Sequence, residues 1–198
     1  MRAAALTGIA VVAIAAGCGG TKTVTITQTS TTVQTVTVTT TTMAATTTTG
    51  PAEAAACTGA DLAGNFSVVA GSAGAGNIVY SLHLTNTSSS PCFVSGLPAV
   101  TLLDKNGSPL PTHVSAAQPG QATAARIVLQ SGDTAKADAR FSPDVPSTGE
   151  QQIGPCEPKA YVLRVTTPGG GTVAAPISPP TAVCGHGGLS FSVFSSAP

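Results

Sequence analysis

Charged side chains are scarce in this chain. Asp, Glu, Lys and Arg make up 8% of its 198 residues and the formal net charge is zero, whereas about 25% of an ordinary globular protein is charged. The chain therefore lacks the cationic surface that binding to nucleic acid or anionic lipid requires. We expect no nucleic-acid partner, and we expect solubility to come from threonine, serine, asparagine and glutamine.

Residues that particular chemistries need are also missing. There is no tryptophan, so a glycosidase would lack a ring on which to stack sugars, and the core tryptophan of the immunoglobulin signature is absent. No Gly-x-Ser-x-Gly or Ser-x-x-Lys motif is present to activate a serine. The three histidines, His83, His113 and His186, have no HExxH or HxH spacing. We therefore predict no catalytic residue, no metal site and no cofactor, and we expect that the protein is not an enzyme.

Two groups of residues come nearest to a chemical site. His186, close to Cys184 in the segment CGHGG, is the best single candidate for a metal ligand, although an exposed loop residue beside a disulfide is the simpler interpretation. Asp133 and Asp138 have the proximity of paired glycosidase carboxylates. A solvated hairpin explains them better, because the chain has eight acidic residues and few aromatic ones.

The N-terminal segment has the order of a secretory signal peptide. One positive side chain, Arg2, precedes an apolar run over residues 3–16. This run is shorter than the roughly 20 residues that a membrane-spanning helix needs. We predict that residues 1–17 are a signal peptide that directs export and does not anchor the protein.

Cys18 follows Ala-Ala-Gly, which resembles the lipobox of bacterial lipoproteins, where the cysteine receives a diacylglyceryl group. Ala15 stands where the lipobox usually has leucine, and residues 13–15 also suit an ordinary signal peptidase. We predict that Cys18 is the lipid attachment site and that the protein lies on the outer face of the cytoplasmic membrane, held by its lipid. Secretion as a soluble protein is the alternative.

Threonine dominates residues 21–49, where it alternates with valine, isoleucine or glutamine and where Lys22 is the one charged residue. The alternation indicates a strand, but such a strand would have little apolar surface to bury, and the same composition describes a cross-β hazard. Threonine-rich segments of exported proteins are also frequent acceptors of O-linked sugar. We predict that residues 18–56 form a lipidated stalk, about 120 Å long if fully extended, with glycosylation as a hypothesis.

Four more cysteines follow the stalk, at Cys57, Cys92, Cys156 and Cys184. In an exported chain an even number indicates disulfides, here two, with three possible connectivities. Buried free thiols are the alternative. None of the four forms a Cys-x-x-Cys pair, so we do not expect a zinc ribbon or a thioredoxin-type site.

Apolar residues alternate along residues 57–198. In residues 77–86, Ile78, Tyr80, Leu82 and Leu84 fall on one face, as in a half-buried strand. Similar alternation occurs in residues 65–71, 99–103, 126–130, 160–167 and 189–193. Asn106-Gly107 suits a tight hairpin turn, and no long stretch has a helical period. We predict one disulfide-stabilised domain over 57–198, an immunoglobulin-like antiparallel all-β sandwich.

The segment GSAGAGNIVYSLHLTNTSSSPCFVSGLPAVTLLDKNGSPL, residues 71–110, resembles the actinobacterial domain of unknown function 4232. It has a glycine-rich turn, a strand that ends in Leu-Thr-Asn at residues 84–86, a cysteine at Cys92, a Gly-x-Pro turn at 96–98 and an Asp-x-x-Gly turn at 104–107. The resemblance extends over residues 57–194 and does not cover the stalk.

The resemblance implies disulfides between Cys57 and Cys92 and between Cys156 and Cys184. It implies no activity, no cofactor and no functional residue, because the family has no assigned role.

The strong signals in the chain thus concern export, anchoring and folding. We expect a cell-envelope lipoprotein that acts as a non-catalytic binding or structural module, with an envelope protein, peptidoglycan or an external ligand as its partner. A small-ligand carrier of the envelope is the alternative, and an enzyme of unfamiliar type is a further one.

Overall fold

A computed structural model describes residues 53–120 and 126–197. By its internal contacts the chain divides into two units, Met1–Gly50 and Pro51–Pro198, and the described residues all belong to the second. The predicted signal peptide, Cys18 and the threonine tract lie outside the described residues. In the part that is described, no helix has the length and apolar character needed to span a membrane.

The regular secondary structure of the described part of the chain is almost all β, as the alternating sequence predicts. Its strands are β1 (Ala55–Ala56), β2 (Leu62–Val68), β3 (Ile78–Asn86), β4 (Cys92–Val94), β5 (Ala99–Leu103), β6 (His113–Ala116), β7 (Ile127–Leu129), β8 (Thr134–Phe141), β9 (Ala160–Thr166), β10 (Thr172–Thr181), β11 (Gly188–Phe191) and β12 (Ser195–Ser196). Two short turns of helix complete it, η1 (Gly59–Asp61) and α1 (Cys184–Gly187).

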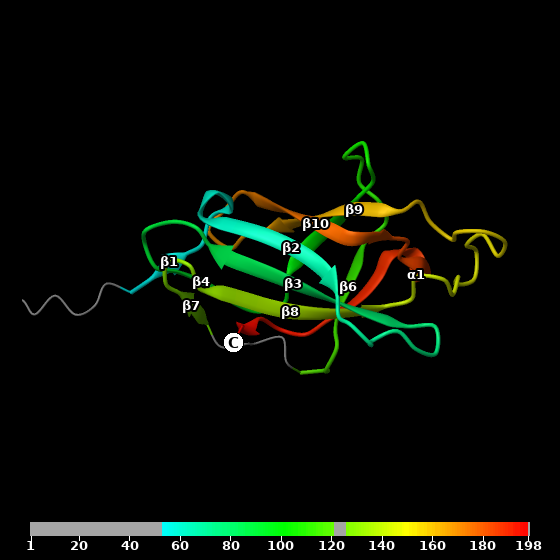
Figure 1. Ribbon diagram of the computed structural model, residues 1–198, viewed down its shortest axis with the longest axis horizontal. Helices are drawn as coiled ribbons and strands as arrows, with labels where there is room; N and C mark the ends of the chain where they lie inside the picture. Colours follow the sequence, from blue (N-terminus) through cyan, green and yellow to red (C-terminus); the bar gives the residue numbers. More distant parts are fainter. Residues whose placement is uncertain (1–52, 121–125, 198) are drawn as a thin grey trace, which may run out of the picture. The chain divides into compact units, whose positions relative to one another are not determined.

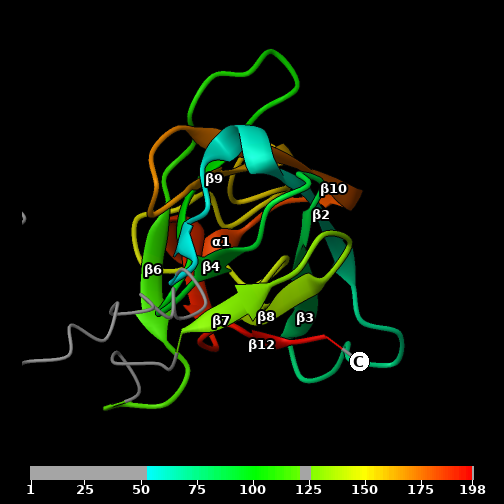
Figure 2. The same cartoon turned by 90° about the vertical axis from the view of Figure 1, so that its left-hand side faces the viewer.

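Most of the strands form one long sheet in the order β5-β9-β10-β2-β3-β8-β11-β6, with β12 also paired to β8. Figure 1 shows its central strands β2, β3 and β8 side by side. A smaller sheet, β1-β4-β7, lies at one end (Figure 2). The long sheet has two halves, β5-β9-β10 and β2-β3-β8-β11-β6. They join only where Ile177 and Ser178 of β10 pair with Phe66 and Ser67 of β2.

Three of the strand pairs are parallel: β10 with β2, β11 with β6, and β1 with β4. The sequence predicts an antiparallel sandwich, and the other pairs are antiparallel. Periodicity gives no information on strand direction, because a residue alternates between faces in the same way in both arrangements. The all-β sandwich is therefore confirmed, with mixed pairing.

The core lies between the two halves of the long sheet. Tyr80, Leu82 and Leu84 of β3 are almost fully buried, as their alternation predicts. They share one hydrophobic cluster with residues of the opposite half, such as Leu163 of β9. Phe66 stacks beside Tyr80 with 5.2 Å between ring centroids, an arrangement that adds to the burial of both rings.

Close approach of the two halves depends on Gly64 in β2. A Cβ atom at this position would lie 3.0 Å from Val173 Cγ1 and 3.1 Å from Ala175 Cβ, both in β10. Contacts this short are rare for real Cβ atoms, so a larger residue would force the layers apart in a close-packed interior.

The first disulfide joins the small sheet to the start of the domain. Cys57 and Cys92 are bonded, with 4.9 Å between their Cα atoms, and this pair is the one that the family resemblance implies. Strand pairing begins before Cys57, because Ala55 of β1 lies opposite Cys92 of β4. The 35-residue separation corresponds to a stabilisation of about 4 kcal/mol in the chain-entropy account.

The turn at Asn106-Gly107 differs in detail from the expected hairpin. Gly107 has a φ of +80°, but Asn106 does not share this conformation. The Asp104 carboxylate also contributes to the turn, because its Oδ1 accepts the N–H groups of Asn106 and Ser108, both at 2.8 Å. Backbone bonds close the same turn, because the N–H of Gly107 donates to the Asp104 carbonyl at 3.1 Å and the N–H of Asp104 donates to the Ser108 carbonyl at 2.9 Å. The Asx turn therefore reinforces a hairpin that the backbone also closes.

Asn86 ends β3 as a buried polar residue with 0% exposure. Its Nδ2 donates to the carbonyls of Ser90, at 2.9 Å, and Leu129, at 3.0 Å. Its Oδ1 accepts the N–H and the hydroxyl of Ser88 at 2.9 and 2.8 Å. One side chain thus ties β3, the loop before β4 and the end of β7 together.

We predict that Asn86→Ala lowers the free energy of unfolding by about 2 to 4 kcal/mol, because it removes the donor to the buried Leu129 carbonyl and the other hydrogen bonds of a fully buried side chain. Urea denaturation followed by circular dichroism measures this loss. Asn106→Ala, in an exposed turn, is the matched control and should change stability by less than about 0.5 kcal/mol. Equal losses in the two variants would contradict the role of Asn86.

Candidate functional site

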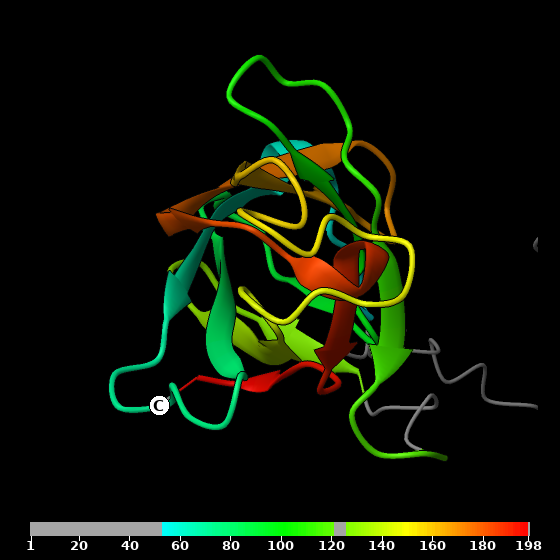
Figure 3. The same ribbon diagram turned by 90° about the vertical axis from the view of Figure 1, so that its right-hand side faces the viewer.

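The loop between β8 and β9 and the short element α1 lie side by side at one end of the domain (Figure 3). The second disulfide joins them, between Cys156 of the loop and Cys184 of α1, with 5.6 Å between Cα atoms. This pair, too, is the one that the resemblance implies. Residues 28 apart in sequence are therefore held as one rigid corner.

α1 is a left-handed turn rather than a regular helix. Gly185, His186 and Gly187 have φ values of +70°, +54° and +76°. A side chain at Gly187 would collide with the carbonyl of Pro111, so glycine is required there. His186 is one of the non-glycine residue types that enter the left-handed region more readily than most, and the glycines on either side of it make the reversal possible.

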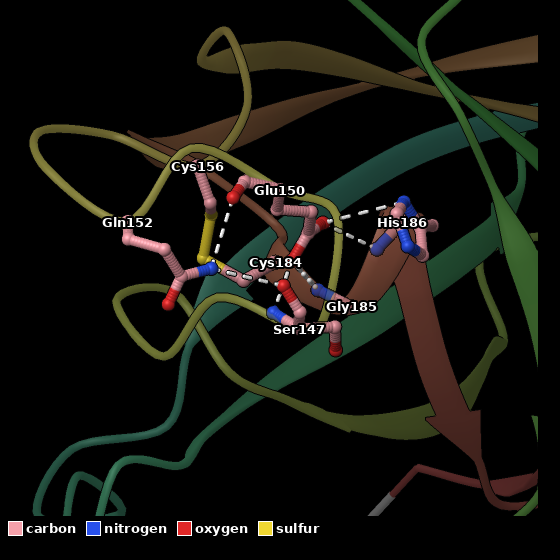
Figure 4. A network of polar contacts seen from close by, with 7 residues as sticks. All are labelled: Ser147, Glu150, Gln152, Cys156, Cys184, Gly185 and His186. Atoms are coloured by element: carbon pink, nitrogen blue, oxygen red, sulfur yellow. Dashed lines mark hydrogen bonds and ion pairs between the residues drawn. A yellow bond between two sulfur atoms is a disulfide. The ribbon is translucent and has the colours of Figure 1, made fainter.

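The carboxylate of Glu150 fills the concave side of this turn (Figure 4). Its Oε1 accepts the N–H of His186 at 2.5 Å, and its Oε2 accepts the N–H groups of Gly185 at 2.9 Å and Ser147 at 2.5 Å. Consecutive N–H groups in such a turn form a nest that favours an anion. In this protein the nest binds a side chain of its own chain, which is only 2% exposed.

The same contacts set the acidity of Glu150. The Ser147 N–H above all holds the pKa of this carboxyl below its ordinary value of 4.5. The N–H groups of His186 and Gly185 and the nearby His186 ring lower it further, while burial works in the opposite direction. The carboxylate is therefore ionised at neutral pH and orders the loop as an anion.

Gln152 completes the network on the loop side. Its Nε2 donates to the carbonyls of Ser147, at 3.1 Å, and Glu150, at 2.9 Å (Figure 4). A loop of irregular backbone thus gains a set of fixed hydrogen bonds. Such loops carry binding sites in many proteins because a rigid scaffold positions them.

Beside this corner is an open depression of about 400 Å³. Polar residues from four separate segments line it: Arg140 of β8, Ser115 of β6, Ser190 of β11, and Ser142 and Ser147 of the loop. Arg140 has no ion-pair partner among residues 53–120 and 126–197. A guanidinium and several hydroxyls can bind a carboxylate and hydrogen-bond to hydroxyl groups.

One group of possible metal ligands stands at the same corner. The side-chain ligand atoms of Glu150, Glu157 and His186 lie within 4.8 Å of one another. His186 Nδ1 is 3.7 Å from Glu150 Oε1, and the imidazole side chain is 51% exposed. The exposed position expected for His186 beside a disulfide is therefore correct. The sequence did not predict that Glu150 and Glu157 would lie next to it.

The other candidates from the sequence do not join this corner. His83 lies in β3, opposite Lys136 of β8. Asp133 accepts the N–H of Gln130 at 2.9 Å in the turn before β8. Asp138 instead accepts the hydroxyl of Ser81 at 2.7 Å. The remaining histidine, His113, begins the edge strand β6.

Glu150 is the residue that the sequence analysis missed. The spacing Ser147-x-x-Glu150 is that of a capping box, in which the glutamate accepts the N–H of the serine. The hydrogen bond from the Ser147 N–H to the Glu150 carboxylate is present here, but no helix follows it directly. The signal was thus available, but it indicates only the local half of the site, because Gly185 and His186 lie 35 and 36 residues away.

A family model described as Domain of unknown function (DUF4232) matches residues 57–193. No curated protein and no solved structure matches the chain significantly.

We predict that Glu150→Gln lowers the melting temperature at neutral pH. A neutral amide oxygen is a weaker acceptor than a carboxylate for the three N–H groups, and the amide NH2 group is itself a donor. The lowered pKa means that the carboxylate stabilises the fold fully above about pH 4.5, and that this contribution is lost as the pH falls through the folded-state pKa. The difference between wild type and variant should therefore shrink in acid. Thermal unfolding from pH 7 to pH 2 measures this.

Glu157→Gln is the matched control. Its melting temperature is measured in the presence of a chelator, so that no bound metal ion contributes to it. The substitution removes a neighbouring carboxylate that accepts none of these N–H groups and should leave the melting temperature unchanged. A constant difference between wild type and Glu150→Gln over the whole pH range would contradict the role given to the ionised carboxylate.

Proposed function

The chain belongs to the family described as Domain of unknown function (DUF4232), and on that premise we propose that it is a non-catalytic binding module of the cell envelope. The depression beside the Glu150 corner is the observation that carries this proposal. It is open, lined by both polar and apolar residues, and framed by a loop that a disulfide and a buried carboxylate hold in place.

The lining of the depression defines the class of ligand. Arg140 offers the geometry that binds carboxylates through paired hydrogen bonds. Four serine hydroxyls, at Ser115, Ser142, Ser147 and Ser190, act as both donors and acceptors. We infer a ligand that carries carboxylate and hydroxyl groups together. Peptidoglycan is an envelope polymer that has both, so we propose it as the partner.

The proposed location rests on the N-terminal sequence. A signal peptide over residues 1–17, a lipid on Cys18 and a threonine-rich stalk would attach the domain to the outer face of the cytoplasmic membrane. The stalk would hold the domain away from the lipid and within reach of the wall, in an actinobacterial lipoprotein.

A carrier of small molecules is the second candidate. The volume of the depression, about 400 Å³, falls in the range of roughly 300 to 1,000 Å³ that small-molecule sites occupy. Native mass spectrometry of the purified protein separates the two candidates. A small molecule bound in stoichiometric amount and lost on denaturation would favour the carrier.

We predict that Arg140→Ala weakens sedimentation with purified peptidoglycan by about tenfold or more, because a charge-assisted contact is removed. The assay compares free and bound protein over a range of peptidoglycan amounts. Arg164→Ala, in β9 and outside the lining of the depression, removes the same charge and should bind like the wild type. Identical binding by both variants, or none by the wild type, would contradict the proposal.

We predict that the protein extracted from its native membrane has the mass of a chain that begins at Cys18 with a diacylglyceryl group attached. Reduction should then add four hydrogens, one for each of four cysteines. Cys18→Ala should move the protein into the soluble fraction. An unmodified chain cut after Ala15 and found in the medium would show instead that the protein is secreted.

A further inference from the structure

We propose that Glu150, Glu157 and His186 form a binding site for one divalent transition-metal ion, with Zn²⁺ as the ion that fits best. The proposal does not depend on the function proposed above, because it concerns the disulfide corner itself and not the ligand of the depression. Its basis is the convergence of two carboxylates and one imidazole from separate parts of the chain.

The distances between the donor atoms suit a small ion. His186 Nδ1 and Glu150 Oε1 are 3.7 Å apart, which is too far for a hydrogen bond. Two ligand atoms on a tetrahedral zinc ion with bonds of about 2.1 Å lie about 3.4 Å apart. The full set spans at most 4.8 Å, and closing around an ion requires only small movements of the two more exposed side chains, Glu157 and His186.

Glu150 provides a fixed point for the site. Its Oε2 already accepts two N–H groups, whereas its Oε1 accepts one, from His186. A carboxylate oxygen has two lone-pair positions, so Oε1 keeps one, and the imidazole Nδ1 lies 3.7 Å from this oxygen. Because three N–H groups hold this carboxylate, little conformational entropy remains to be lost when it binds an ion.

The disulfide places the other two ligands. Glu157 follows Cys156 directly, and His186 lies two residues after Cys184. The Cys156–Cys184 bond therefore fixes both backbones beside Glu150, and only the Glu157 and His186 side chains need to be ordered. This arrangement resembles metal sites in which the ligands are positioned before the ion arrives.

The donor set selects the class of ion. Imidazole nitrogen favours Zn²⁺, Cu²⁺ or Ni²⁺, while Mg²⁺ and Ca²⁺ prefer sites made of oxygen atoms alone. Two carboxylates balance the double charge of the ion. Three protein ligands leave a fourth tetrahedral position for water or an external group, as in other three-ligand zinc sites.

Titration of Zn²⁺ alone into the full chain, with both disulfides formed, tests the proposal. Isothermal calorimetry should show one equivalent bound. Single His186→Ala and Glu157→Gln variants should each bind about tenfold more weakly or worse, because changes even to residues that merely support a metal ligand have effects of that size. Zn²⁺ should also raise the melting temperature of the wild type, since it binds only the folded state.

His83→Ala is the matched control and should bind Zn²⁺ like the wild type, because β3 places this histidine elsewhere in the domain. The test avoids Glu150→Gln, which would loosen the loop as well as remove a ligand. The proposal is overturned if the wild type binds no Zn²⁺, or if His186→Ala and Glu157→Gln bind it as tightly as the wild type. A loss in His83→Ala equal to that in His186→Ala would overturn it too.

Discussion

Burial of the apolar face of β3 is the interaction on which the rest of the domain depends. This strand pairs with β2 on one side and β8 on the other, and its side chains Tyr80, Leu82 and Leu84 enter the cluster that joins the two halves of the sheet. In a chain with so few charges, apolar burial supplies most of the driving force for folding. At the C-terminal end of β3, Asn86 binds carbonyls in the loop before β4 and at the end of β7, and so attaches these neighbouring segments to the strand.

Buried polar groups in this domain each have partners. Among the described residues, no buried side-chain nitrogen or oxygen lacks a hydrogen bond. Asn86 and Glu150 show how this is achieved, because each is a buried polar side chain that binds backbone groups of segments distant in sequence. A buried polar group without a hydrogen-bond partner lowers the stability of the fold, so these two residues stabilise the backbone groups that they bind. They determine how loops without regular structure are attached to the sandwich.

The corner around Glu150 combines rigidity with exposed donor groups. The carboxylate accepts the N–H groups of a left-handed turn, and the Cys156–Cys184 disulfide keeps the two segments in contact. The His186 side chain and the depression with its serine hydroxyls stay open to solvent at the margin of this corner. A rigid frame with exposed polar groups is the arrangement that binding sites on loops share, and both proposals above begin from it.

The sequence by itself determined the class of fold, because the signals involved are local. Alternation along β3 and the glycine-rich turn at residues 71–77 depend only on neighbouring residues, and the even cysteine number needs only a count. The tertiary structure alone decided the direction of each strand and which residues bind the Glu150 carboxylate. Gly185 and His186 reach this carboxylate from more than 30 residues away, and no periodicity records which distant turn will present its N–H groups to which side chain. The physical reason is that such contacts follow from the packing of the whole sheet, which brings β8, β11 and the loop between β8 and β9 to one corner.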